Sequence, residues 1–211
     1  MAPSDVSFLL LFALIFTVSR YIHGIPARQY LLTGSSVLLY SLWDWRFVPV
    51  LLGVSAIAYF SGVAIVSSSG RRNRGLVTMA IVSILLVLLG FKYTNFLLST
   101  VSDIQKLFGI QAESLRFDLI FPLGISYYTF RAISYIVDVR NDNANLERKF
   151  HLVVLYIGFF PILTAGPITR AHAFLSQAHQ LPHASAEDLA KGLQQFVIAR
   201  VRQFAPKNMV F

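Results

Sequence analysis

Long apolar runs alternate with short polar gaps along most of this 211-residue chain. A transmembrane helix needs about 20 mostly apolar residues. The pattern predicts about six spanning helices, over Val6–Ser19, Tyr30–Leu42, Phe47–Val66, Leu76–Leu98, Phe121–Val139 and Leu152–Ala165. The first run is expected to be a retained helix, because Asp5 precedes it where a signal peptide carries basic residues. We therefore predict an all-α polytopic transmembrane helix bundle.

Two further segments have a mixed pattern. In Ser99–Phe117, apolar residues recur at near-helical spacing among polar ones, which indicates a helix along the membrane surface or packed in a loop. Ala186–Phe204 is amphipathic and too polar for a spanning helix. These segments add amphipathic helices to the predicted bundle.

Composition supports lipid as the solvent of these helices. The chain is 55% hydrophobic and 13% charged, whereas soluble proteins carry about 25% charged residues. A water-facing surface needs polar residues that are missing here, so the excess apolar surface is expected to face the lipid bilayer. The chain has no cysteine, which excludes disulfides, thiolate metal sites and a cysteine nucleophile.

The net charge of +8 is explained by membrane topology. Arg20 and Arg28 lie between the first two runs and three arginines lie in Ser67–Gly75, whereas Asp44 and Arg46 cancel between the second and third runs. The positive-inside rule places the N-terminus outside and the Ser67–Gly75 loop in the cytoplasm of a cell (inner) membrane protein. Basic residues without an aromatic-bearing basic face predict no nucleic-acid partner.

The fifth run carries polar residues at helical spacing. Pro122 suits the first turn of a helix. One stripe then contains Tyr127, Arg131, Ser134, Tyr135 and Asp138. An arginine near mid-span costs about 3 kcal/mol on insertion scales, so Arg131 is expected to face the bundle interior or a water-filled cavity. Arg131 could approach Asp138 two turns away, directly or through Ser134 or water. The stripe is either a polar funnel wall that meets a substrate or a structural seam between helices.

The segment Phe159–Arg170 contains two prolines and a glycine, which break the helix near its end. Broken backbone at membrane depth is tolerated where it is buried in protein or lines a cavity. Gly166 and Pro167 are equally explained by an ordinary helix end. Both interpretations stay open from the residues alone.

The residues predict no metal site and no bound cofactor. The five histidines all lie outside the apolar runs and show no His-Glu-x-x-His spacing. The chain also has no Walker loop, no dinucleotide-binding glycine pattern and no Gly-x-Ser-x-Gly elbow.

Four stretches, in this order, resemble the membrane-bound O-acyltransferase family, and most closely its branch of alginate O-acetyltransferase and D-alanyl transfer proteins. They are Leu39–Phe47, Leu89–Phe96, Phe121–Asp138 and Phe159–Arg170. The last two are fairly specific, and the resemblance covers the chain to about Ile198. The resemblance implies a helix bundle around a central funnel, over a domain of residues 1–198.

What the resemblance implies is the transfer of an acyl group, expected to be acetyl, to a hydroxyl of a surface polysaccharide. The donor would be acetyl-CoA or an acyl carrier on the cytoplasmic side, and accessory periplasmic acetylation proteins are expected partners. The motif positions are Pro122, Gly124, Tyr128, Asp138, Gly166, Pro167 and Arg170, with roles in funnel packing and shape. Tyr127 and Arg131 are added from the stripe, and Arg131 stands where relatives usually have a neutral polar residue.

The family's key histidine lies in the second half of a protein about twice this long, so no catalytic residue is assigned to this chain. Residues 199–211 form an atypical tail, and Pro206 would stop a helix there. We expect a truncated or frameshifted gene product, or half of a split gene. The alternative hypothesis is a non-catalytic membrane scaffold or permease component, which the two helix-breaking segments also suit.

Overall fold

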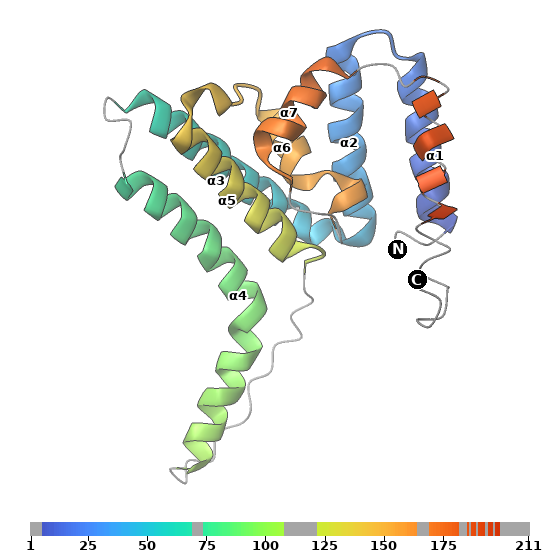
Figure 1. Ribbon diagram of the computed structural model, residues 1–211. Helices are drawn as coiled ribbons and strands as arrows, with labels where there is room; N and C mark the ends of the chain where they lie inside the picture. Colours follow the sequence, from blue (N-terminus) through green and yellow to red (C-terminus); the bar gives the residue numbers. More distant parts are fainter. Residues whose placement is uncertain are drawn as a thin grey trace, which may run out of the picture. The chain divides into compact units, whose positions relative to one another are not determined.

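The computed structural model divides into two compact units, Met1–Gln180 and Leu181–Phe211. It describes residues 6–68, 74–107, 122–163, 169–181, 185, 187–188, 190–192, 194–195 and 197–198. Throughout these residues the regular structure is helical, which confirms the predicted all-α class. The helices α1 to α7 lie in the first unit (Figure 1).

The helices of the first unit follow the predicted runs closely at the start of the chain. In order they are α1 (Val6–Tyr21), α2 (Ile25–Asp44), η1 (Trp45–Phe47), α3 (Val48–Ser67), α4 (Arg74–Leu107), α5 (Ile125–Asn141), η2 (Asn143–Asn145), α6 (Phe150–Gly158), η3 (Phe160–Ile162) and α7 (Ala171–Gln180). At 1.5 Å per residue, the 20-residue helices α2 and α3 are each about 30 Å long, which matches the hydrocarbon core of a bilayer.

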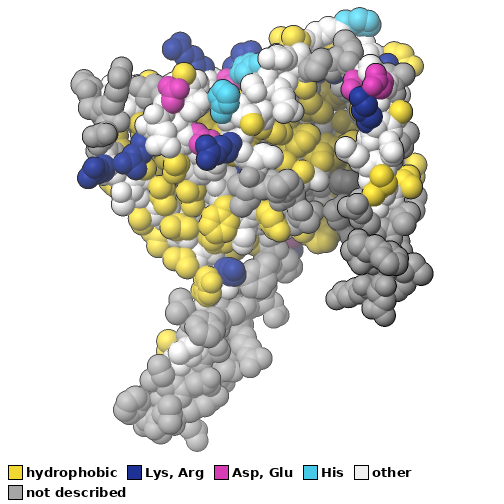
Figure 2. Space-filling model, viewed as in Figure 1, with side chains coloured by type: hydrophobic (Ala, Val, Ile, Leu, Met, Phe, Trp, Pro, Cys, Tyr) yellow, Lys and Arg dark blue, Asp and Glu magenta, His cyan; other side chains and the backbone are white. Residues whose placement is uncertain are grey.

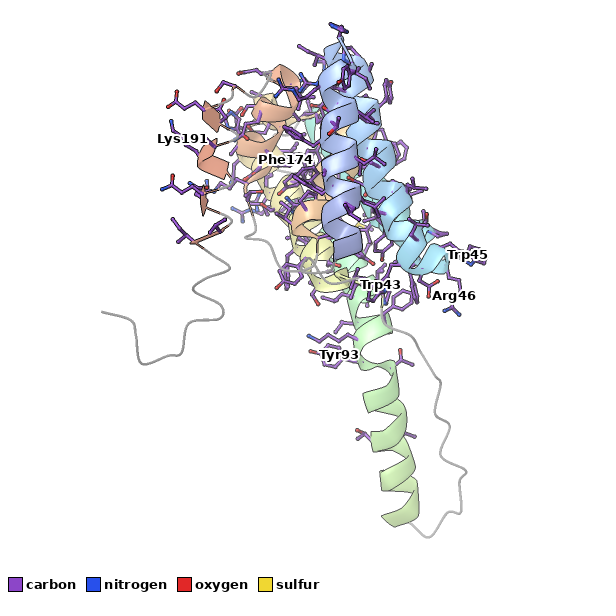
Figure 3. All side chains as sticks on the ribbon, turned by 90° about the vertical axis from the view of Figure 1, so that its right-hand side faces the viewer. Trp43, Trp45, Arg46, Tyr93, Phe174 and Lys191 are labelled. Atoms are coloured by element: carbon purple, nitrogen blue, oxygen red, sulfur yellow. The ribbon has the colours of Figure 1, made fainter. Side chains whose placement is uncertain are left out.

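The junction between α2 and α3 is a tight polar turn. Asp44 ends α2, and its carboxylate accepts hydrogen bonds from the backbone N–H of Arg46 (3.1 Å) and from the Arg46 guanidinium (2.7 Å). Trp43 and Trp45 are 47% and 73% exposed beside it, and Trp45 projects outward from the bundle in Figure 3. Exposed tryptophans beside a polar turn fit the headgroup level of a membrane.

The core lies where α3, α5 and α6 meet, with α4 against α3 and α5 and with α2 against α6. Two glycines permit the close packing. A Cβ on Gly158 of α6 would lie 3.1 Å from Leu51 of α3, and one on Gly62 of α3 would lie 3.2 Å from Leu146 and from the Tyr135 ring. The absence of side chains at these positions brings three helices into contact around residues that are almost wholly buried.

The sixth predicted span is not confirmed, because α6 has only nine residues, about 14 Å of helix. Both α6 and α7 meet the same end of α2. Thr33 donates to the carbonyl of His151 at the start of α6 (3.2 Å), and Gln29 donates to the carbonyl of Ala178 near the end of α7 (3.0 Å). The segment from α6 to α7 therefore begins and ends at one end of the bundle, where Figure 1 shows the two helices beside α2.

The helix α4 is longer than its predicted span. It runs for 34 residues, about 51 Å, and includes the first part of Ser99–Phe117, which the sequence pattern separated from it. Residues 108–117 of that predicted surface helix lie outside the described residues. The polar residues between Thr100 and Leu107 therefore continue the helix of the fourth run.

The exposed surface is that of a membrane protein. Among the described residues, two helical stretches are long and apolar enough to cross a bilayer, Ile25–Ser67 and Arg74–Thr94. Large apolar side chains point away from the core, among them Phe60 (66% exposed), Met79 (69%) and Leu86 (61%). In Figure 2 hydrophobic side chains cover a broad face of the bundle, and charged and histidine side chains gather along one margin of it.

Candidate functional site

The motif stretches Phe121–Asp138 and Phe159–Arg170 contact each other directly. Gly124 has φ +68° at the start of α5, and a Cβ there would lie 2.5 Å from the carbonyl oxygen of Leu163. This left-handed conformation suits glycine, and the backbone contact leaves no room for a side chain. The preceding Pro122 is buried and its carbonyl accepts the N–H of Ile125 (3.3 Å). The start of α5 is thereby positioned against the chain that follows α6.

Arg131 lies about two turns beyond Gly124 on α5 and is only 2% exposed. Its Nη2 donates to Thr169 Oγ1 (3.3 Å), just before α7. The guanidinium carbon lies 4.9 Å from the centre of the Tyr156 ring and 5.7 Å from that of Phe174. Tyr156 in turn donates its hydroxyl to the Thr169 carbonyl (2.9 Å). Arginine and two aromatic rings thus connect α5, α6 and α7.

Asp138 does not pair with Arg131, although the sequence spacing suggested that the two side chains could meet. Its Oδ2 accepts the backbone N–H of Ala171 (3.1 Å), the first residue of α7. A carboxylate at a helix N-terminus is favoured by the free N–H groups and by the helix dipole. Arg131 and Asp138 are two turns apart on α5. Arg131 contacts Thr169 and Phe174, whereas Asp138 contacts the first residue of α7.

The predicted stripe on α5 divides in the folded chain. Tyr135 is fully buried beside Arg131, whereas Tyr127 is 37% exposed. Its neighbour Tyr128 is fully buried and packs edge-on against Tyr40 of α2, with ring centres 6.4 Å apart. The buried face of α5 is wider than the predicted stripe and includes Tyr128 in place of Tyr127, because α3, α4 and α6 all pack against this helix.

The remaining motif positions are only partly described. Arg170 is exposed immediately before α7, and its carbonyl accepts the N–H of Phe174 (3.2 Å). Gly166 and Pro167 lie outside the described residues. The described site therefore consists of the start of α5, the Arg131 cluster and the Asp138 contact with α7.

A polar cluster that the sequence analysis missed lies between the α5–α6 connection and α7. Glu147 is 6% exposed, and its carboxylate lies 2.5 Å from Nε2 of His179 and accepts the backbone N–H of Lys149 (2.9 Å). The buried Tyr135 hydroxyl forms two hydrogen bonds with the backbone of Glu147. It accepts the Glu147 N–H at 3.2 Å and donates to the Glu147 carbonyl at 3.4 Å. Glu147 therefore joins α5, the connecting segment and α7.

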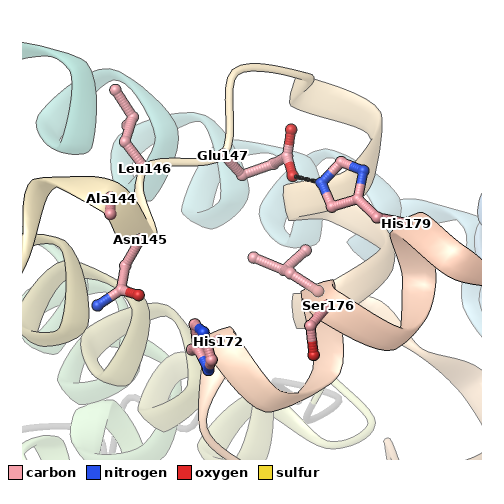
Figure 4. A pocket seen from close by; sticks show the side chains of 8 residues that line it. Ala144, Asn145, Leu146, Glu147, His172, Ser176 and His179 are labelled. Atoms are coloured by element: carbon pink, nitrogen blue, oxygen red, sulfur yellow. Dashed lines mark hydrogen bonds and ion pairs between the residues drawn. The ribbon is translucent and has the colours of Figure 1, made fainter.

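A pocket of about 160 Å³ opens beside this cluster (Figure 4). Its lining includes Asn145, Glu147, His172, Ser176 and His179. His172, Ser176 and His179 follow i, i+4 and i+7 spacing, so they share one face of α7. That spacing is the signal in the sequence from which this polar face could have been predicted. Within the described part of the chain, no group of three or more acidic or histidine side chains could hold a metal ion.

Replacing Glu147 with alanine should lower the free energy of unfolding by about 1–3 kcal/mol, because it removes a buried acceptor from two donors. Glu187→Ala is the matched control, since Glu187 is 75% exposed in an i,i+4 ion pair with Lys191 and should contribute less than about 0.5 kcal/mol. Denaturant titration of the detergent-solubilised chain measures both. Equal effects would show that Glu147 is not a structural anchor.

The chain is similar to three kinds of named acyl-transferring protein. The probable alginate O-acetylase AlgI of Pseudomonas aeruginosa is 31% identical over 206 residues, which cover 96% of this chain and 39% of that protein. The peptidoglycan O-acetyltransferase of Helicobacter pylori is 26% identical over 168 residues, 68% of this chain and 31% of that protein. The teichoic acid D-alanyltransferase of Bacillus subtilis is 36% identical over 58 residues, 28% of this chain and 15% of that protein.

The chain spans about two-fifths of the length of the alginate O-acetylases that it matches. No protein-family model matches it, and no solved structure matches it. The match to the alginate O-acetylases nevertheless runs through all four motif stretches, since it covers 96% of the chain.

Proposed function

Because this chain belongs to the membrane-bound O-acyltransferase family, in its alginate O-acetylase-like branch, we propose that it is part of an enzyme that transfers an acyl group, expected to be acetyl, to a hydroxyl of a surface polysaccharide. Acetyl-CoA or an acyl carrier would be the donor, used as a co-substrate. Accessory periplasmic proteins would assist transfer to the polysaccharide. No catalytic residue is assigned to this chain.

One observation carries the proposal: the two most specific motif segments of the sequence are packed against each other in the fold. Gly124 contacts Leu163, Arg131 binds Thr169 and Asp138 binds the N-terminus of α7. Segments that are separate in the sequence thus form one buried polar wall. Such a wall suits a funnel that admits polar substrates into a membrane-embedded site. Pro122, Gly124, Tyr128, Asp138, Gly166, Pro167 and Arg170 would shape it.

The proposed topology has the N-terminus outside the inner membrane and the Ser67–Gly75 loop in the cytoplasm. The helices α1 to α5 would cross the bilayer, and the α6–α7 segment would enter from the cytoplasmic side and return to it. The contacts of both its ends with Gln29 and Thr33 of α2 support this arrangement. Basic residues in the connection before α6, such as Arg148 and Lys149, agree with a cytoplasmic position.

Acetyl transfer tests the proposal directly. The protein encoded by the full reading frame that contains this chain is reconstituted with radiolabelled acetyl-CoA and a surface polysaccharide. We expect label in the polysaccharide, and Arg131→Leu should reduce it about 100-fold, because losing about 3 kcal/mol of a buried charged contact corresponds to that factor. Arg140→Leu, at a partly exposed arginine of the same helix, is the control and should retain activity.

Membrane insertion of Arg131→Leu should be intact, since leucine is favoured over arginine in a bilayer. Absence of transfer by the unchanged protein with any acyl donor would favour the membrane scaffold or permease component. Full activity of Arg131→Leu would remove Arg131 from the proposed wall and leave the transferase proposal standing.

A further inference from the structure

We propose that Arg131 is a buried receptor for an anionic oxygen ligand, a carboxylate or a phosphate, inside the helix bundle. This inference concerns the charge of Arg131 and does not depend on acyl transfer. It starts from a side chain that is 2% exposed and is the largest of the fully buried side chains. A guanidinium stays protonated in proteins and has five N–H donors to satisfy.

The hydrogen bonding of Arg131 is incomplete. Its Nη2 donates to Thr169 Oγ1, and this bond is long at 3.3 Å. Its Nε and Nη1 are buried and have no hydrogen-bond partner among the described residues. A buried polar group normally finds a partner, and a buried charge normally finds an opposite charge or a ligand. Two of the three guanidinium nitrogens are therefore available to an oxygen acceptor.

Two acidic residues that contact α7 have other partners. Asp138 accepts the N–H of Ala171, and Glu147 binds His179 and the N–H of Lys149. No ion pair to Arg131 occurs among the residues that the structure describes. The negative charge that would balance this guanidinium is thus not supplied by the described part of the chain.

The aromatic contacts explain how the cation is retained without an acidic partner. The Tyr156 and Phe174 rings lie 4.9 and 5.7 Å from the guanidinium carbon, within the range of a cation–π interaction. Ring faces stabilise the charge, but they accept no N–H in the plane of the guanidinium. Carboxylate and phosphate oxygens match these in-plane donors and are the preferred partners of arginine.

The experiment is a thermal unfolding titration of the purified chain in a non-ionic detergent, followed by the fluorescence of its two tryptophans. Sodium acetate and inorganic phosphate are the probes, and sodium chloride at matched ionic strength is the reference. At a hundredfold excess over its Kd, the bound anion should raise Tm by about 5 °C or more. The response should saturate in the unchanged chain and in the control Arg140→Gln.

Arg131→Gln should lose this saturable response while it retains cooperative unfolding. If that variant does not fold, Arg131→Lys gives the second measurement, and its Kd should be about tenfold weaker because lysine lacks the planar fork. A response to acetate alone would identify a carboxylate site, and a response to phosphate alone a phosphate site. Equal shifts in the unchanged chain and in both Arg131 variants, or no shift with either anion in the unchanged chain, would overturn the inference.

Discussion

Replacing Gly124 with valine should lower the free energy of unfolding by about 2–5 kcal/mol. The left-handed conformation costs an L-residue about 1–2 kcal/mol, and most for a β-branched side chain. Overpacking adds about 1–3 kcal/mol, because the new Cβ would lie 2.5 Å from the backbone oxygen of Leu163, which cannot move like the end of a flexible side chain. Denaturant titration of the detergent-solubilised chain measures the change.

Gly90→Ala is the matched control. Gly90 lies inside α4, and a Cβ there would meet no atom within 4 Å. Alanine should therefore stabilise the chain by about 0.5–1 kcal/mol through its higher helix propensity. If both substitutions changed the stability by the same small amount, the contact between the two motif segments would not be important for the fold.

Cysteine labelling should place Arg148 and Gln180 on the same side of the membrane. The chain contains no cysteine, so Arg148→Cys, Gln180→Cys and Trp45→Cys are each uniquely labelled. In oriented vesicles, an impermeant maleimide should label the first two from the cytoplasmic side and Trp45→Cys from the outside. The expected effect is close to all or none, because Gln180 ends α7 beside the start of α6.

The six-span arrangement predicts the opposite result for Gln180→Cys. A spanning helix over Leu152–Ala165 would carry the chain outside, where Gln180 would be labelled together with Trp45. Labelling of Gln180→Cys from the outside would therefore contradict the returning α6–α7 segment. A thiol at Arg148 serves as the internal control, since both arrangements place it in the cytoplasm.

Much of the fold could be predicted from the sequence because apolar length and spacing reflect the solvent of each helix. The runs at Phe47–Val66 and Leu76–Leu98 correspond to α3 and to most of α4. A spanning helix over Leu152–Ala165 is not confirmed, because the described part of that run forms the nine-residue helix α6 and the short helix η3. Apolar composition shows that a helix is buried, but it does not distinguish burial in lipid from burial among other helices.

The sequence indicated which α5 residues face the interior better than it indicated what they contact. Arg131 was correctly expected to face the interior, because an exposed arginine at mid-span is costly. Its partners Thr169, Tyr156 and Phe174 could not be predicted, since spacing within α5 says nothing about α6 or α7. The same limit explains why the Glu147 contact with His179 was missed, because 32 residues separate the pair.

The sequence by itself determined that this chain is a helical membrane protein of the alginate O-acetylase-like branch, since apolar periodicity and motif residues are local properties. Only the tertiary structure decided that Asp138 binds the N-terminus of α7, that Gly124 lies against Leu163, and that two nitrogens of Arg131 have no partner in the part of the chain that the structure describes. These features depend on which helices meet and at what depth. Packing of distant segments sets that geometry, and no local pattern encodes it.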